Sequence, residues 1–163
     1  MRWTQLLFAI CVNLLWVVPA GSQASSAEAL PAPLRAHVQS EKFGIVTSVR
    51  GLPLGVRDAL QMLFGSGTLD IADPGAEFQM KGAVRNARLP LRRLVAAGCS
   101  TDHCLVYYER GGTDHTWHVG LFHWTPAATR LEWGATAPGG LATINDVMNA
   151  VLSGKIKGQP RFW

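Results

Sequence analysis

The sequence predicts an α+β fold with an antiparallel β-sheet and helices packed on one face of that sheet. Three observations favour this class. Predicted strands outnumber predicted helices, short turns join successive strands, and an amphipathic helix follows the last strand. Of the 163 residues, 48% are hydrophobic and 16% are charged, which is enough apolar surface for one folded domain and argues against disorder.

Residues 1–24 are typical of a secretory signal peptide. Arg2 supplies a positive charge, residues 6–18 form an uncharged apolar run, and Ser22 and Ala24 place small side chains before a cleavage point after Ala24. The apolar run is shorter than the roughly 20 residues that a spanning helix needs. We therefore expect export to the periplasm, with secretion beyond it left open, and no membrane span.

Cleavage after Ala24 would leave residues 25–163 and remove Arg2, which lowers the net charge from +4 to +3. Basic residues are scattered, and Arg92 and Arg93 are adjacent, so no basic stripe indicates nucleic-acid binding. Residues 25–41 are rich in Ala, Ser and Pro and predict a flexible leader. Residues 42–163 then form a single domain.

In the first half of this domain, residues 43–49 predict a short strand. Apolar residues at helical spacing predict a helix over 53–64, with Gly65 as its stop. Residues 68–72 and 77–81 flank the turn sequence Asp73-Pro74-Gly75 and predict a hairpin.

The second half has clearer signals. Four strands are predicted, over residues 91–97, 105–109, 116–124 and 129–134, and the third is the richest in β-branched and aromatic side chains. Thr143 and Asp146 have the spacing of a capping box at the start of a helix, and Gly154 follows its end.

After export only Cys99 and Cys104 remain, because Cys11 lies in the signal peptide. An even number of cysteines in an oxidising compartment predicts a disulfide, and the C-x4-C spacing is neither a thioredoxin-type redox motif nor half of a zinc motif. The bond would hold Ser100, Thr101, Asp102 and His103 in a tight polar loop. Such a loop can enter a partner's cleft with little loss of conformational entropy. A turn that is cross-linked for stability alone is the alternative.

Five histidines raise the question of a metal site: His37, His103, His115, His118 and His123. Those of the predicted strand alternate between its faces, and the chain has no HExxH motif, so we expect no metal and no cofactor. A G-x-S-x-G motif is also missing. Asp114, His115 and Glu109 form a weak alternative for catalysis, and we expect a protein that is not an enzyme.

The segment from Leu94 to Gly154 resembles the inhibitor of vertebrate lysozyme (Ivy) family of exported bacterial proteins. The matching pieces are Cys99-x4-Cys104 with a His and an Asp inside, Val106-Tyr107-Tyr108-Glu109, Gly120-Leu121-Phe122, Arg130-Leu131-Glu132-Trp133 and Val151-Leu152-Ser153-Gly154. They follow one another in the family's order and approximate spacing. In the family loop a His precedes an Asp, whereas Asp102 precedes His103 here.

The resemblance implies an inhibitor that inserts its loop 99–104 into the active-site cleft of a C-type lysozyme-like glycoside hydrolase. His103 would hydrogen-bond toward the catalytic carboxylates, and Ser100, Thr101 and Asp102 would shape the loop or contact the cleft. The alternative is a periplasmic ligand- or envelope-binding module without inhibitory activity. Formation of a homodimer is left open.

Overall fold

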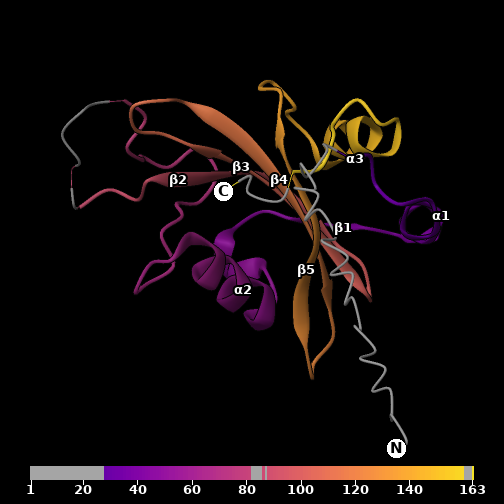
Figure 1. The fold of residues 1–163 in the computed structure, drawn as a ribbon. Coiled ribbons are helices and arrows are strands. Elements are labelled where there is room, and N and C mark those ends of the chain that lie inside the picture. The colour runs from indigo at the N-terminus through magenta and orange to yellow at the C-terminus, as the bar shows by residue number, and fades with distance from the viewer. Residues whose placement is uncertain (1–27, 82–85, 87, 160–162) are drawn as a thin grey trace, which may run out of the picture.

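A computed structural model describes residues 28–81, 86, 88–159 and 163. It contains a five-stranded sheet and three α-helices (Figure 1). In chain order the elements are α1 (Ala32–Ser40), β1 (Gly44–Val46), a 3₁₀ turn (Val49–Gly51), α2 (Leu54–Phe64), β2 (Arg92–Cys99), β3 (His103–Arg110), β4 (Thr116–Trp124), β5 (Thr129–Ala137) and α3 (Ile144–Leu152). The predicted α+β class is therefore confirmed.

The five strands form an antiparallel meander in the order β1-β2-β3-β4-β5, so that each strand pairs with its neighbour in the chain. The register places Cys99 opposite Cys104 and His103 opposite His123. Short turns join β2 to β3 and β4 to β5, as an antiparallel ladder permits. The sheet therefore brings one end of β2, β3 and β4 together around the cysteine pair.

Helices cover both faces of the sheet, whereas the sequence predicted helices on one face. In β3, Tyr107 belongs to one apolar cluster and Tyr108 to the other, and both side chains are fully buried. Successive side chains of a strand point to opposite faces, so two buried neighbours require a cover on each side.

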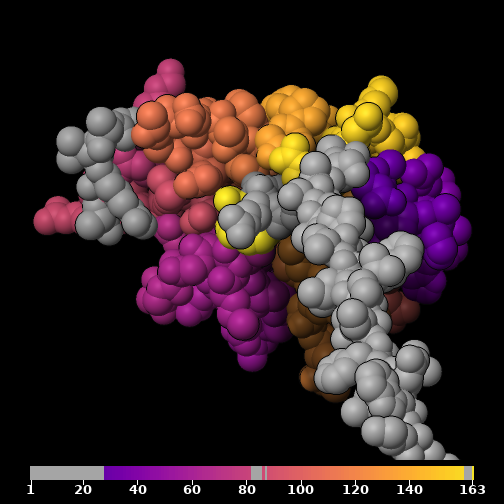
Figure 2. Space-filling view, viewed as in Figure 1, coloured from indigo at the N-terminus to yellow at the C-terminus, as the bar shows by residue number. Residues whose placement is uncertain are grey.

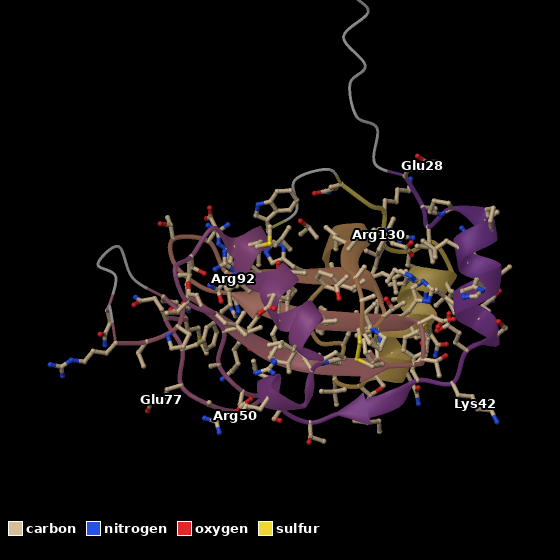
Figure 3. The ribbon with its side chains drawn as sticks, turned by 90° about the horizontal axis from the view of Figure 1, so that it is seen from below. Glu28, Lys42, Arg50, Glu77, Arg92 and Arg130 are labelled. Atoms are coloured by element: carbon tan, nitrogen blue, oxygen red, sulfur yellow. A yellow bond between two sulfur atoms is a disulfide. The ribbon has the colours of Figure 1, made fainter. Side chains whose placement is uncertain are left out.

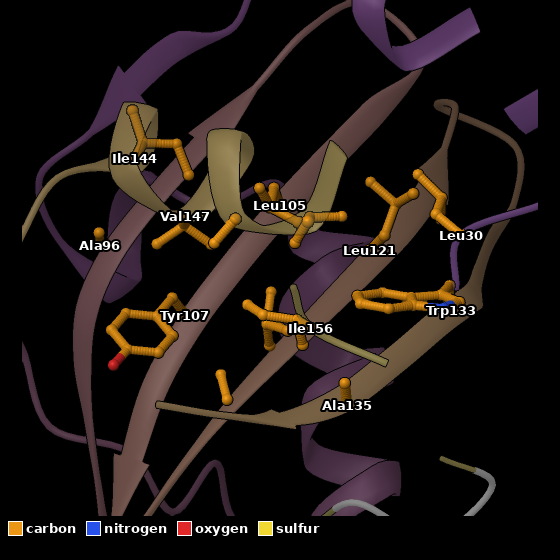
Figure 4. Packing of buried hydrophobic residues seen from close by; sticks show 14 of the residues in the cluster. Leu30, Ala96, Leu105, Tyr107, Leu121, Trp133, Ala135, Ile144, Val147 and Ile156 are labelled. Carbon is orange, nitrogen blue, oxygen red and sulfur yellow. The ribbon is translucent and has the colours of Figure 1, made fainter. Parts of the chain in front are cut away.

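On the first face, α3 and α1 pack beside each other (Figures 1 and 2). Figure 4 shows Ile144 and Val147 of α3 lying over Leu105 and Tyr107 of the sheet. Thr143 caps α3: its hydroxyl accepts from the Asp146 backbone N–H, and the Asp146 carboxylate accepts from the Thr143 N–H. The predicted capping box is confirmed.

On the second face, α2 places Val56 and Leu60 against Val106, Tyr108 and other sheet residues. The helix begins one residue after the predicted start and ends at its predicted end. Gly65 closes it in the left-handed conformation, with φ of 61°, which favours glycine.

Among the described residues, no helix has both the length and the apolar character needed to cross a membrane.

Two predicted segments differ from the structure. Residues 28–41 do not form a loose leader, because α1 occupies Ala32–Ser40 and buries Val38, while Leu30 fills the core beside it. Residues 68–81 form the predicted turn at Asp73 but no hairpin: Ala72 pairs instead with Arg93, and Lys81 with Gly112. One arm of the turn therefore pairs with β2, and the other pairs with the segment that follows β3. The predicted signal peptide lies outside the described residues.

Candidate functional site

The disulfide between Cys99 and Cys104 closes the turn between β2 and β3, as predicted. The two residues are cross-strand partners, and their sulfur atoms are 2.06 Å apart. Only residues 100–102 lie between the two strands. We call these three residues the hairpin tip.

Hydrogen bonds fix the conformation of the hairpin tip. The Ser100 hydroxyl accepts from the backbone N–H groups of Asp102, at 3.2 Å, and His103, at 2.9 Å. From β4, the Trp124 backbone N–H donates to the Asp102 carbonyl at 2.9 Å, and its indole N–H donates to the Ser100 carbonyl at 3.3 Å. The tip is therefore preorganised by both the disulfide and the neighbouring strand.

The structure divides the four predicted contact residues into two groups. Thr101 is exposed, the Asp102 side chain is 48% exposed, and Ser100 is half-buried. His103, in contrast, is only 3% exposed. The expectation that His103 projects outward from the loop is therefore wrong: its side chain turns inward beneath the tip, where polar partners surround it.

The two ring nitrogens of His103 each face a carboxylate. Nδ1 lies 2.6 Å from Oε1 of Glu41, which follows α1, and Nε2 lies 3.0 Å from Oε2 of Glu132 on β5. A neutral imidazole has one N–H donor and one acceptor nitrogen. With two carboxylate oxygens around a neutral ring, one of these contacts needs a further proton, on the ring or on the carboxyl group, or a metal ion.

Each carboxylate has a further partner. The second oxygen of Glu41 accepts from the Ser100 hydroxyl, so that Glu41 holds the hairpin tip as well as His103. The second oxygen of Glu132 accepts from the Arg130 guanidinium at 2.5 Å. In Figure 3 Arg130 is seen toward the α1 end of the sheet, away from Glu77. These bonds fix the orientation of both carboxylates around His103.

Two more imidazoles complete the cluster around His103. The rings of His37 and His123 each lie edge-on to it, with centroids 5.2 Å and 5.3 Å away. His37 Nε2 is 3.0 Å from Glu41 Oε1 and 3.8 Å from an Asp102 carboxylate oxygen. We call His37, Glu41, His103, His123 and Glu132 the histidine cluster.

The histidine cluster contains two overlapping sets of metal-ligand donors: His37, Glu41 and His103, and His103, His123 and Glu132. Within each set the donor atoms lie within 4.8 Å of one another. Sequence reasoning included His37 but considered convergence only among the strand histidines, and it missed Glu41 and Glu132. The available signal was the spacing of His37 and Glu41, which lie on one face where a helix is present.

The other predicted histidines lie elsewhere on the sheet. His118 is buried and stacks on Tyr108. His115 Nε2 lies 2.7 Å from Glu109, whose other oxygen is bound by Arg93.

The catalytic alternative needed Asp114 to join Glu109 and His115. Asp114 is exposed, and within the described part of the chain no hydrogen bond links it to either group. Glu109 is only 5% exposed and is shared between His115 and Arg93. This arrangement suits a structural ion pair better than a catalytic dyad with an orienting carboxylate.

No protein-family model, curated protein or solved structure matches the chain. We therefore infer function from the residues and their geometry.

Proposed function

We propose that this protein is an exported, non-enzymatic inhibitor of C-type lysozyme-like muramidases, and that its hairpin tip enters the active-site cleft of the target. The preorganised, disulfide-closed tip with its exposed polar side chains is the observation that carries this proposal. The resemblance of residues 94–154 to the Ivy family supports the choice of target.

Preorganisation favours such binding. A flexible loop loses conformational freedom when it enters a cleft, and that loss weakens affinity. Here the disulfide, the Ser100 hydroxyl and two bonds from Trp124 already hold the tip in one conformation. More of the contact free energy therefore remains available for binding.

The chemistry of the tip complements that of a glycosidase cleft. Such a cleft holds one protonated carboxylic acid and one ionised carboxylate. The exposed Asp102 carboxylate can accept a hydrogen bond from the acid, and the Thr101 hydroxyl can donate to the carboxylate. C-type lysozymes are typically basic, and the negative charge of Asp102 also favours the encounter with such a protein.

His103 takes a different role in this proposal from the one that the sequence suggested. It is buried among Glu41 and Glu132 and positions the tip through Glu41 and Ser100. Its replacement by alanine would leave two carboxylates beside an empty space, so that loss of folding and loss of inhibition would be confounded. Thr101 and Asp102 provide the cleaner test.

The test measures inhibition of a C-type lysozyme by the purified protein. We expect wild-type protein to inhibit it, and Thr101→Val and Asp102→Asn each to weaken inhibition at least about tenfold, since a tenfold change in affinity is about 1.4 kcal/mol. The chain offers a matched control in Thr113 and Asp114, an exposed Thr-Asp pair in the turn between β3 and β4. Thr113→Val and Asp114→Asn should leave inhibition unchanged.

Two results would contradict the proposal. One is the absence of inhibition of C-type lysozymes by a large molar excess of the folded protein. The other is equal inhibition by wild type, Thr101→Val and Asp102→Asn, which would place the contact outside the tip.

A second candidate function is a ligand-binding module. It is favoured by a recess of about 430 Å³ between α2 and the β4–β5 turn, whose lining includes Leu54, Met62 and Trp124. Leu54 and Met62 are 63% and 82% exposed. Small-molecule sites usually have volumes of roughly 300–1,000 Å³. Saturable binding of an apolar fluorescent dye that is lost in Leu54→Asp, without lysozyme inhibition, would favour this alternative.

A further inference from the structure

The short contacts of His103 leave one place in the histidine cluster for a proton or a metal ion. Both ring nitrogens face carboxylate oxygens, at 2.6 Å and 3.0 Å, and a neutral ring can donate to only one of them. The second contact is bridged either by a further proton, on the ring or on the carboxyl group, or by a metal ion bound to one nitrogen. The arrangement of the neighbouring donor atoms favours the metal ion.

Three donor atoms converge on one side of His103. Oε1 of Glu41 lies 2.6 Å from Nδ1 of His103 and 3.0 Å from Nε2 of His37, and each of the three residues offers a ligand atom within 4.8 Å of those of the other two. Ligand atoms bound at about 2.0–2.2 Å to a tetrahedral zinc ion are roughly 3.3–3.5 Å apart. An outward movement of less than about 1 Å would therefore open a space for the ion.

The surroundings of these donors also fit a metal site. A metal-bound histidine usually donates its other N–H to a carboxylate, which fixes the ring and strengthens the ligand. Here Nε2 of His103 faces Glu132, and Arg130 holds Glu132 in turn. The second oxygen of Glu41 accepts from Ser100. The His37 nitrogen points at the same oxygen of Glu41 and supplies the third donor atom of a metal site.

The other donor set, with His103, His123 and Glu132, is less suitable. The Arg130 guanidinium binds Glu132 at 2.5 Å, and this fixed positive charge disfavours a second cation there. His37, in contrast, is 54% exposed, so solvent can reach the first set.

We propose that His37 Nε2, Glu41 Oε1 and His103 Nδ1 bind one divalent transition-metal ion of the Zn²⁺ type. Two imidazoles, one carboxylate and an open fourth position form a ligand set that zinc accepts. The ion would connect α1 to β3 beneath the hairpin tip. This inference does not depend on inhibition of a lysozyme.

Calorimetric titration of zinc chloride into chelator-treated protein tests the site. We expect one ion per chain, and an affinity at least about tenfold weaker in His37→Ala and in Glu132→Gln, which remove a ligand and the partner of a ligand. His37 is exposed, so its variant should fold normally, which circular dichroism would verify. His115→Ala removes an imidazole outside the cluster and should bind zinc like the wild type.

A second measurement reports the geometry. Cobalt(II) in place of zinc should give the strong visible absorption of a four-coordinate ion in the wild type and a weaker band in His37→Ala. Absence of zinc binding, or equal affinity in wild type and His37→Ala, would overturn the proposal. Zinc binding that is lost in His123→Ala but kept in His37→Ala would also overturn it, because the ion would then occupy the other donor set.

Discussion

Tyr107 shows how complete burial in the core affects a single side chain. Its ring is completely buried, its hydroxyl donates to the Pro138 carbonyl at 2.7 Å, and burial raises its pKa from 10.0 to about 12. Burial also raises the pKa of Tyr108, on the opposite face. A tyrosinate in either position would lose its hydration, which disfavours the charged form.

These raised pKa values predict an alkaline loss of stability. Between pH 10.0 and about pH 12 the unfolded chain loses the Tyr107 proton while the folded chain retains it, so the free energy of unfolding falls as pH rises through this range. Below pH 10 both the folded and the unfolded chain keep the Tyr107 proton, so this residue no longer makes the free energy of unfolding depend on pH. Urea denaturation at a series of pH values measures the slope, and Tyr107→Phe should reduce it. An identical slope in that variant would show that Tyr107 titrates normally.

Single residues also show why the site was only partly predictable. Cys99, Cys104 and the polar tip lie close together in the sequence, and the disulfide was predicted from the two cysteines and the expected export. The contacts of His103 could not be predicted in this way, because Glu41 and Glu132 are 62 and 29 positions away from it in the sequence. Residue type suggested an imidazole available for contact, whereas the tertiary fold placed two acids against it.

At the scale of elements, the capping box of α3 is a measurable contribution to stability. The Thr143 hydroxyl and the Asp146 carboxylate satisfy backbone N–H groups that would otherwise lack partners at the start of the helix. We expect Thr143→Ala to lower the free energy of unfolding by about 1 kcal/mol. Thr143→Ser, which keeps the hydroxyl, should lose little. Equal losses in the two variants, measured by urea denaturation, would argue against the cap.

The elements that were predicted correctly have strong local patterns. Apolar spacing, Gly65 and the capping residues defined α2 and α3, and β-branched and aromatic residues defined β4. Helix α1 has a weaker pattern, since Val38 is its one buried residue and Pro33 in its first turn looked like a loop signal although proline is common there. The arms on either side of Asp73 have strand composition, but the partner of a short strand depends on the fold.

At the scale of the whole molecule, the sheet separates two apolar clusters, and both should support one cooperative fold. Leu60 is fully buried between α2 and the sheet, whereas Leu54 on the same helix is 63% exposed. Leu60→Ala should destabilise the protein by about 2–5 kcal/mol, because it leaves a cavity. Leu54→Ala should change stability by less than about 0.5 kcal/mol. Similar losses in both variants would contradict this packing.

Glu28, the first residue described, pairs with Gly158 through two backbone hydrogen bonds of 3.1 Å and 2.6 Å. The path of the chain from residue 28 to residue 158 is therefore almost a closed ring. A short linker could join these ends, and new termini could be opened in the exposed turn at residues 126–128 without interrupting any strand. The fold is thus suited to circular permutation, which would move the start of the chain next to the hairpin tip.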